Sequence, residues 1–400
     1  MITTITPYSD LRNRASVGGN YDGVVRISIN GSYGTGTLLF DGRAVLTAAH
    51  LFSKVSSSSI ATVIFDTSTG QQTINSTHIE VIPSFDVINY NNDLALVWLS
   101  SSAPVSAQRY ELYRSSDEIG QTMTMVGYGT PGTGNTGILT TYNGDKLRLT
   151  ASNQFDADGA TLKTALGTQL SWTPTANQLI ADYDNGNSAQ DALGQLINKL
   201  GLGLGQNEGM ISTGDSGGPA FINGMIVGIA SYTASISLGI IHPDIDTLKN
   251  SSFGEIGAWQ RVSNYQQWID QTIRSQYVDA PTKTEQVKTS IIEGNNGTTL
   301  NYFLLQVTGV RTDSAQLLSV DYTTRDGTAI AGQDYLATKG TLVLYSNEKQ
   351  AVIPVEIIGD NISEPNEIFY LDVFNPVGGS FGTDVIKLTA VRTIVNDDIA

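Results

Sequence analysis

The stretch Thr213-Gly214-Asp215-Ser216-Gly217-Gly218-Pro219-Ala220 decides how the rest of the chain is interpreted. A serine among three glycines and a proline is not expected in a regular helix or in the middle of a sheet. Such a loop can hold the Ser216 hydroxyl outward while the N–H groups of Gly214 and Ser216 turn inward, where they can stabilise an oxyanion. The alternative is a glycine-rich turn without a chemical role.

Composition limits the class of protein. A chain of 400 residues is long enough for two or three domains, and 40% hydrophobic residues with many Gly, Ser and Thr predict a soluble, β-rich globular protein. There is no cysteine, which excludes disulfides and thiolate metal sites. A formal charge of −16, concentrated after Glu285, argues against nucleic acid or anionic membranes as partners.

The sequence contains neither a membrane span nor a visible export signal. No apolar run reaches the roughly 18 residues that a bilayer requires. The first residues lack a basic region followed by an apolar segment, so no signal peptide is expected. We expect an extracellular or cell-surface protein that is exported without an N-terminal signal peptide, with a cytoplasmic location as the alternative.

Two further motifs lie upstream of the serine. Histidine occurs only at His50, His78 and His242, and His50 ends the run Thr47-Ala48-Ala49-His50. Asp93 leads from polar residues into an apolar strand, Leu94-Ala95-Leu96-Val97. The order His50, Asp93, Ser216, each residue within its own motif, resembles the trypsin-like serine proteases. The alternatives for His50 and Asp93 are a packed core side chain and a strand-entry turn.

This resemblance implies a mechanism. His50 would accept the Ser216 proton, Asp93 would orient the imidazole, and the N–H groups of Gly214 and Ser216 would hold the oxyanion. The expected activity is hydrolysis of protein or peptide substrates by a serine endopeptidase, with no cofactor for catalysis. The rival hypothesis is a catalytically silent protease-like scaffold that acts as a calcium-dependent matrix or adhesion protein.

The same resemblance implies an all-β fold of two six-stranded β-barrels with a C-terminal helix, here Ser263–Gln276. We expect the protease domain to cover residues 21–278, after an N-terminal tail or propeptide at 1–20. Within that tail, Arg14-Ala15-Ser16-Val17-Gly18-Gly19 resembles the activation junction of the family, whose new amino terminus would pair with Asp215. An ordinary tail is the alternative.

Four residues are candidates for substrate binding by the same resemblance. Met210 stands six positions before Ser216, where trypsin-type enzymes carry an acid. Ser231 and Tyr232 lie on the strand expected to bind substrate backbone, and Thr233 replaces a glycine at the pocket mouth. These residues predict an uncharged side chain before the scissile bond. The acids Asp246 and Glu255, in an insertion at 234–255, leave open a negative charge from another direction.

The other insertion, residues 153–209, contains the oxygen-rich run Asp182-Tyr183-Asp184-Asn185-Gly186-Asn187. Such a run can bind calcium, but it lacks the full spacing of an EF-hand loop. The sequence therefore favours a polar turn here.

Residues 279–289 are expected to form a linker, and residues 290–400 carry different motifs. Val320–Ala329, Asp334-Tyr335, Asp360–Glu367 and Ile394–Asp398 resemble a Calx-beta domain. The resemblance implies an immunoglobulin-like β-sandwich that binds structural Ca²⁺ and contacts a matrix or cell-surface ligand. Gly359 and Asn396 depart from the acidic pattern, and an acidic cap without metal is the alternative. The implied calcium ligands are Glu293, Asp326, Asp360, Glu364, Asp397 and Asp398.

Overall fold

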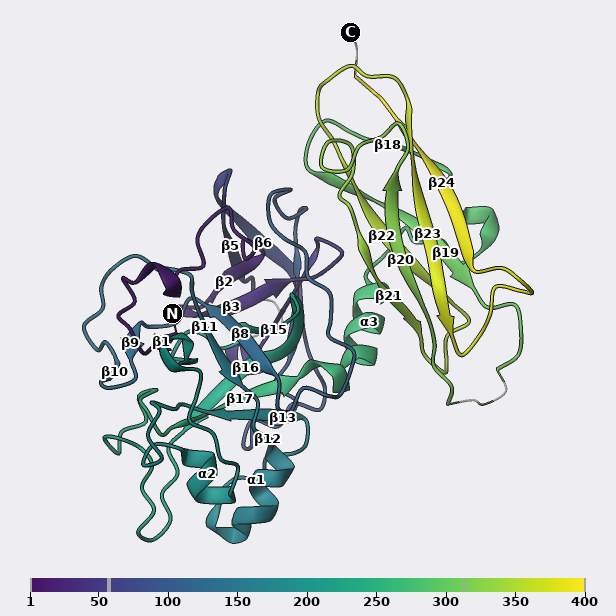
Figure 1. Ribbon diagram of the computed structural model, residues 1–400. Coiled ribbons are helices and arrows are strands. Elements are labelled where there is room, and N and C mark those ends of the chain that lie inside the picture. Colours follow the sequence, from purple (N-terminus) through teal and green to yellow (C-terminus); the bar gives the residue numbers. More distant parts are fainter. Residues whose placement is uncertain (1, 56–58, 312, 314, 399–400) are drawn as a thin grey trace. The chain divides into compact units, whose positions relative to one another are not determined.

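The computed structural model describes residues 2–55, 59–311, 313 and 315–398 (Figure 1). The chain divides into two compact units. The first comprises the residues up to Leu39, Arg43–Ser100 and Ser106–Gln266, and the second comprises Phe40–Gly42, Ser101–Val105 and Gln267 onward. Strands dominate both units and helices are few, which confirms the expected all-β class.

A closed six-stranded barrel forms the first half of the first unit, in the order β2-β3-β4-β7-β6-β5. Side chains of β2 and β5 alternate in burial, so that Val63 and Phe65 point into the barrel. Gly36 lies so close to Ile27 and Val45 that an added Cβ would meet each at 2.6 Å, so only glycine fits there. The strands are β2 (Val24–Ile29), β3 (Ser32–Leu38), β4 (Ala44–Thr47), β5 (Thr62–Thr67), β6 (Gly70–Val81) and β7 (Ala95–Leu99).

A seven-stranded sheet, β11-β8-β15-β16-β17-β13-β12, forms the second half. Two of its strands come from the 153–209 insertion, and they extend the sheet beyond β17. Trp259 and Met125 are buried in the core behind it. The strands are β8 (Thr122–Gly127), β11 (Leu149–Gln154), β12 (Ala157–Asp158), β13 (Gln178–Asp182), β15 (Pro219–Ile222), β16 (Met225–Ala234) and β17 (Ile256–Arg261).

The N-terminal segment is part of this unit, contrary to the expected tail at 1–20. Ile2 is fully buried, and β1 (Thr3–Thr4) lies between β9 (Gly132–Thr133) and β14 (Gly209–Met210) in a four-stranded sheet that β10 (Gly137–Ile138) completes. Arg14 forms a β-bridge with Leu149. Backbone pairing of β1 and burial of the Ile2 side chain hold this segment in place. The polar composition of residues 1–20 indicated neither feature.

The helices of the first unit are short and lie mainly in the insertion. They are η1 (Leu11–Asn13), η2 (Ala49–Phe52), α1 (Gly159–Leu166), η3 (Gly167–Gln169), α2 (Ala192–Ile197), η4 (Gly205–Asn207) and η5 (Val262–Asn264). The expected helix at Ser263–Gln276 is α3 (Gln266–Ser275). Just before this helix, Ser263 Oγ donates a hydrogen bond to Glu118 Oε1 at 2.6 Å.

The second unit contains the expected β-sandwich. One sheet has the order β18-β24-β23-β20-β21, and the other pairs β19 with β22. Phe303, Tyr335 and Phe369 form an aromatic centre in its core, with Phe369 stacked on Tyr335 at 4.7 Å between ring centroids. After η6 (Thr284–Gln286) the strands are β18 (Ser290–Ile292), β19 (Thr298–Gln306), β20 (Leu318–Asp326), β21 (Lys339–Leu344), β22 (Gln350–Ile358), β23 (Glu367–Val377) and β24 (Lys387–Val395).

Among the described residues, no helix combines the length and the apolar character that crossing a membrane would require.

Candidate active site and acidic clusters

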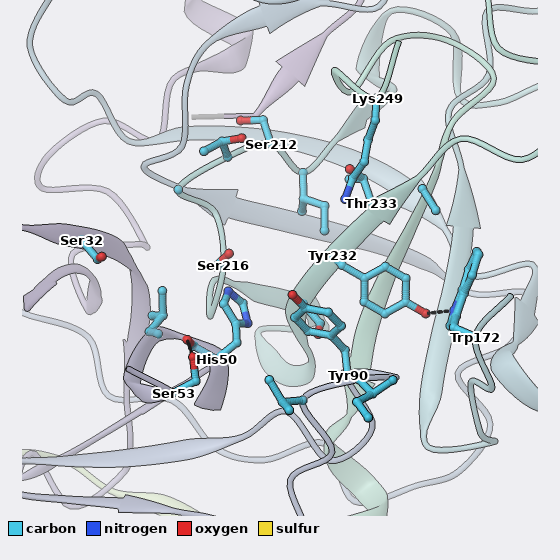
Figure 2. A pocket seen from close by; sticks show the side chains of 18 of the residues that line it. Ser32, His50, Ser53, Tyr90, Trp172, Ser212, Ser216, Tyr232, Thr233 and Lys249 are labelled. Atoms are coloured by element: carbon cyan, nitrogen blue, oxygen red, sulfur yellow. Dashed lines mark hydrogen bonds between the residues drawn. The ribbon is translucent and has the colours of Figure 1, made fainter. Parts of the chain in front are cut away.

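An open cleft of about 1250 Å³ in the first unit brings His50 and Ser216 together. Figure 2 shows the Ser216 side chain beside the imidazole of His50, with Tyr90 and Tyr232 on the far side of the ring. His50 lies in η2, directly after β4, and Ser216 lies in the loop before β15. Residues that are distant in sequence therefore meet because the barrel and the seven-stranded sheet each end at this cleft.

The Asp93 carboxylate fixes the position of His50 through two hydrogen bonds. The carboxylate is fully buried, and its Oδ2 lies 2.7 Å from His50 Nδ1 while Oδ1 accepts the His50 backbone N–H at 2.8 Å. Ser231 Oγ donates to the same Oδ2 at 2.5 Å. A carboxylate only accepts hydrogen bonds. Because Nδ1 faces the Asp93 carboxylate, Nδ1 carries the hydrogen and Nε2 remains an acceptor. The imidazole is thus fixed in one orientation and one tautomer.

The serine loop has the geometry that its glycines suggested. Gly214 has a φ of +96°, and a Cβ there would meet the Tyr33 ring at 2.4 Å. The carbonyls of Gly214 and Ser216 turn toward the barrel, where they accept hydrogen bonds at 2.9 Å from Thr35 Oγ1 and the Thr35 N–H. Within the described residues, the N–H groups of Gly214 and Ser216 have no hydrogen-bond partner. Two donors are therefore available beside the Ser216 hydroxyl.

Asp215 points away from the cleft into the domain. Its carboxylate is buried and accepts hydrogen bonds from Gly129 N at 2.8 Å, from Ser212 N at 2.9 Å and from Ser212 Oγ at 3.2 Å. Burial raises the pKa of Asp215, and the hydrogen bonds from Ser212 counteract this rise. Asp215 thereby anchors the serine loop from behind.

Three of the four expected substrate residues line the cleft. They are Ser231, Tyr232 and Thr233, and the Tyr232 hydroxyl accepts a hydrogen bond of 3.0 Å from Trp172 Nε1 (Figure 2). Met210 does not reach the cleft, because it is fully buried in β14 and packs in the core. Counting back from Ser216 fixed only the position in sequence, whereas the pairing of Met210 with Thr3 of β1 and its packing in the core decide where the side chain lies.

Sequence reasoning missed other residues of the cleft. Trp172 comes from the 153–209 insertion, and Thr247 and Lys249 come from the 234–255 insertion. The Lys249 side chain runs toward Thr233 (Figure 2). The place of the 234–255 insertion between two strands expected to border the substrate site was the one sequence signal for Thr247 and Lys249. It did not single out either residue.

An acidic cluster lies in the second unit, in loops and at strand ends of the sandwich. The charges of Asp360, Asp398, Glu364 and Asp397, after burial, raise the pKa of Glu293 to about 7. Carboxylate oxygens of Asp334, Glu364 and Glu367 lie within 4.8 Å of one another. Five of the six expected ligands thus gather here. Asp326 is engaged elsewhere, since its Oδ1 accepts hydrogen bonds from Tyr335 at 2.5 Å and from Ala331 N at 3.0 Å.

Asp334 and Glu367 were not among the expected ligands, although both stand in the motifs that identified the domain. Three buried oxygens of the cluster have no hydrogen-bond partner in the described part of the chain, namely Glu293 Oε1, Glu367 Oε2 and Asp398 Oδ2. Buried carboxylate oxygens without donors are costly unless a cation compensates them. The donor set, all oxygen and strongly negative, fits Ca²⁺.

Comparison with known proteins gives two family matches and several relatives. The Trypsin family profile matches residues 12–269, and the Calx-beta domain profile matches residues 287–398. The chain is 36% identical over 90 residues to the sodium/calcium exchanger Calx of Drosophila melanogaster, covering 22% of this chain and 9% of the exchanger. It is 37% identical over 110 residues to the human sodium/calcium exchanger 2, covering 24% and 12%. The chain spans about a tenth of the length of these relatives.

Among solved structures, the chain is similar to neuropsin, a serine protease expressed in the limbic system of mouse brain. The match covers 65% of this chain and 98% of that protein, with 18% sequence identity and a TM-score of 0.46.

Proposed function

The chain belongs to the trypsin family and carries a C-terminal Calx-beta domain, and from this we propose that it is a serine endopeptidase that acts through Ser216, His50 and Asp93. The observation that supports this most directly is the His50–Asp93 pair, at 2.7 Å between Nδ1 and Oδ2, with Ser216 beside the imidazole in an open cleft. Nothing else in the site is needed to remove the serine proton.

The proposed reaction uses the tautomer that Asp93 imposes. His50 Nε2 accepts the proton as Ser216 Oγ attacks the peptide carbonyl, and the imidazolium then protonates the leaving amine. Asp93, fully buried and hydrogen-bonded by Ser231, stabilises the charged ring. A water molecule, activated by the same histidine, then hydrolyses the acyl-enzyme. In that step His50 takes one proton from the water and returns it to Ser216 Oγ as the acyl–oxygen bond breaks, so the starting enzyme is restored without a cofactor.

The negative charge of the tetrahedral intermediate requires donors of its own. The free N–H groups of Gly214 and Ser216 are the proposed oxyanion donors, and each such donor is typically worth about 3 kcal/mol of transition-state stabilisation. The Thr35 hydrogen bonds to the carbonyls of the same two residues hold the loop in the conformation that exposes them.

Covalent labelling with a fluorophosphonate probe tests this function. The full chain is expected to be labelled once, at Ser216, and labelling is expected to vanish in Ser216→Ala. Ser237→Ala is the matched control, because Ser237 also lines the cleft but lies outside the proposed triad. Labelling that persists in Ser216→Ala, or an unlabelled wild type that also cleaves no peptide, would favour the silent-scaffold alternative.

For the Calx-beta domain we propose structural Ca²⁺ binding by the acidic cluster. The residues that would hold the ion are Glu293, Asp360, Glu364, Asp397 and Asp398, together with Asp334 and Glu367. When bound, Ca²⁺ would neutralise carboxylates that otherwise repel one another. It takes no part in the proposed chemistry at Ser216.

A further inference from the structure

A second acidic cluster lies inside the protease domain, where the 153–209 insertion folds back on itself. Asp182 ends β13, and Asp184 follows two residues later. Asp191 stands at the N-cap of α2, and its Oδ1 accepts the Gly194 N–H at 2.7 Å. One carboxylate oxygen from each of these three buried residues lies within 4.8 Å of the other two.

Two more carboxylates face the same place. An added Cβ on Gly201 would lie 3.6 Å from Asp184 Oδ2 and 3.9 Å from Asp156 Oδ1. A Cβ on Gly203 would lie 2.7 Å from Asp184 Cβ and 3.0 Å from Glu208 Oε2. The 201–203 loop therefore covers the cluster closely. Gly201 and Gly203 have no side chain that could fill the space, and the Leu202 side chain is 53% exposed.

Buried oxygens in this cluster lack donors. Asp184 is 5% exposed and Glu208 is 1% exposed, yet Asp184 Oδ1 and Glu208 Oε1 have no hydrogen-bond partner among the described residues. Within the described part of the chain, none of the five acids forms an ion pair with a lysine or arginine. A protein interior does not ordinarily leave a carboxylate in this state.

The electrostatic cost is correspondingly large. Burial, followed by repulsion from Asp191 and Asp156, raises the pKa of Asp184 to about 8. Burial likewise raises the pKa of Glu208 to about 8, and that of Asp156 to about 7 despite the opposing charge of Lys199. Five acids packed together without an ion pair among the described residues, with only the opposing charge of Lys199 on Asp156, would oppose folding unless a cation occupies the space among them.

We propose that Asp156, Asp182, Asp184, Asp191 and Glu208 bind a calcium ion within the protease domain. The donors are all oxygen, which suits a hard cation and disfavours zinc, because the cluster holds no His or Cys. Asp182 Oδ2 and Glu208 Oε2 also accept backbone N–H groups at 2.6 Å, from Leu193 and Leu204, so the loops already hold these ligands in place. Ca²⁺ tolerates the irregular geometry of such a cage better than Mg²⁺.

The site links the insertion to the wall of the catalytic cleft. Glu208 directly precedes β14, and the chain then runs through Ile211, Ser212 and Gly214 along the cleft. An ion held by Glu208 and by the insertion acids would fix the start of this wall. Calcium is thus expected to stabilise the domain itself, separately from the Calx-beta cluster.

The test uses the full chain carrying Ser216→Ala, so that self-cleavage cannot interfere. Equilibrium dialysis with radioactive calcium should show that Asp184→Asn binds one Ca²⁺ fewer than the Asp145→Asn control, in which the substituted acid is exposed and lies outside the cluster. Mg²⁺ at the same concentration should displace little of the bound calcium. Equal calcium binding by the two variants overturns the site, and efficient displacement by Mg²⁺ overturns the assignment to calcium.

Thermal unfolding gives an independent reading, because the proposal fixes opposite signs under two conditions. In chelator, Asp184→Asn relieves repulsion and should melt above the parent protein. In excess Ca²⁺ the same variant loses a ligand and should melt below it. A variant that melts higher under both conditions would show a cluster without an ion. Glu208→Gln should repeat the pattern and serves if Asp184→Asn does not fold.

The charges that line the cleft suggest which substrates it binds, and this inference rests on the proposed endopeptidase function. Although the protein has a net charge of −16, no Asp or Glu occurs among the described residues that line the cleft. The charged side chains there are Lys54, Lys249 and, when protonated, His50. Neither lysine forms an ion pair or hydrogen bond with a described residue. Asp246 and Glu255 do not line the cleft, so they do not supply the negative charge that the sequence left open.

We infer that Lys249 selects substrates with an acidic side chain before the scissile bond. Lys249 runs toward Thr233, at the part of the cleft where the uncharged residue was expected to bind (Figure 2). The Lys249 ammonium, which has no ion-pair or hydrogen-bond partner among the described residues, offers a carboxylate one charge-assisted hydrogen bond, and the Thr233 hydroxyl beside it offers a second donor (Figure 2). A cationic substrate side chain would be repelled at the same point.

Two fluorogenic peptides that differ only in Glu or Gln before the scissile bond test this inference. Wild type is expected to cleave the Glu peptide with at least a tenfold higher kcat/KM. Lys249→Ala should lower the Glu/Gln ratio at least tenfold, and Lys249→Glu should invert it, whereas the exposed Lys288→Ala should not change it. Active enzyme that prefers Gln, or a ratio that Lys249→Ala leaves intact, overturns the specificity alone. Absence of any hydrolysis or probe labelling overturns the endopeptidase function and the specificity with it.

Discussion

The Asp93 carboxylate receives a hydrogen bond that is not part of the three-residue motif. Ser231 Oγ donates to Asp93 Oδ2 at 2.5 Å, on the same oxygen that faces His50. In Ser231→Ala the buried carboxylate loses one donor, and a hydrogen bond to a charged group contributes about 1.5–3 kcal/mol. If the lost hydrogen bond stabilises the transition state more than the bound substrate, kcat drops about tenfold to a hundredfold while KM changes little.

Steady-state kinetics on a peptide substrate checks this, with Ser53→Ala as control, because the one hydrogen bond of the Ser53 hydroxyl among the described residues goes to the His50 backbone carbonyl and not to the Asp93–His50 pair. Ser231→Thr should recover much of the lost rate. Unaltered kcat in Ser231→Ala would mean that Asp93 is sufficiently held by His50 alone.

At the residue scale, local patterns in the sequence were enough for some residues and not for others. His50, Asp93 and Ser216 each stand in a contiguous motif, and the fold brings the three motifs to one cleft. Met210 was placed by counting back from Ser216, and counting fails here because Met210 pairs with Thr3 of β1 and packs in the core. Lys249 lies in an exposed insertion without any local pattern, so only the fold places it in the cleft.

At the scale of elements, β1 shows how a short segment can complete a domain. Ile2 is fully buried among Met210, Trp259 and other core residues, and Thr3 Oγ1 donates to the Ser251 carbonyl at 2.8 Å. Ile2→Ala should therefore lower the free energy of unfolding by about 2–5 kcal/mol. Leu11→Ala, at a side chain that is 83% exposed, is the control and should change it little. Chemical denaturation of both variants measures the difference, and equal midpoints would contradict the packing of β1.

The proposed calcium site in the protease domain could not be predicted from any single element of the sequence. Asp182 and Asp184 were visible as a local run of oxygen ligands. Asp156 and Glu208 stand more than twenty residues away on either side, and they join the cluster only because β12 pairs with β13 and the chain returns at β14. A sequence pattern cannot show that such residues lie close together, because only the pairing of the strands brings them there.

The sheet formed by β20, β23 and β24 contains a buried carboxylate whose pKa is lowered. Burial alone would raise the pKa of Asp372, but hydrogen bonds from Thr389 at 2.6 Å, Lys387 at 3.2 Å and Arg325 at 3.3 Å hold it below 3.8. Because the folded state then binds the proton less tightly than the unfolded chain, this stability is present above about pH 4 and is lost as the pH falls through the folded-state pKa.

Asp372→Asn should therefore destabilise the sandwich by about 1–3 kcal/mol at pH 7 and by less at pH 3. Calorimetry of wild type and variant across this range gives the comparison. Asp321→Asn is the control, since Asp321 accepts hydrogen bonds from Thr341 and Asn375 but has no ion pair among the described residues. A stability difference that stays constant with pH would exclude the ionised form of Asp372 as its source.

At the scale of the whole molecule, the charge of −16 is arranged in a way that composition does not reveal. Acids gather in one cluster of the protease domain and one of the Calx-beta domain, while the described lining of the catalytic cleft has none. Because each cluster is proposed to bind a cation, we expect the stability of the whole chain to depend on calcium, while the proposed catalytic residues remain outside both clusters.

The Calx-beta cluster can be separated from the protease cluster in a single experiment. An ion that binds only the folded state stabilises it by about 2.7 kcal/mol when its concentration is a hundredfold above the dissociation constant. Calorimetry of the full chain carrying Ser216→Ala should show that Ca²⁺ raises the transition of the sandwich and that Glu293→Gln, which alters a buried ligand with a free Oε1, removes this rise. Asp326→Asn should retain it, because Asp326 is engaged by Tyr335 and Ala331 instead.

Each variant should leave the response at Asp184 unchanged, because the two clusters belong to different units of the chain. Loss of the calcium response in Asp326→Asn together with its retention in Glu293→Gln would move the ion from the cluster around Glu293 to the Asp326 loop. Identical transitions with Ca²⁺ and with chelator in the unsubstituted chain would contradict calcium binding at both acidic clusters.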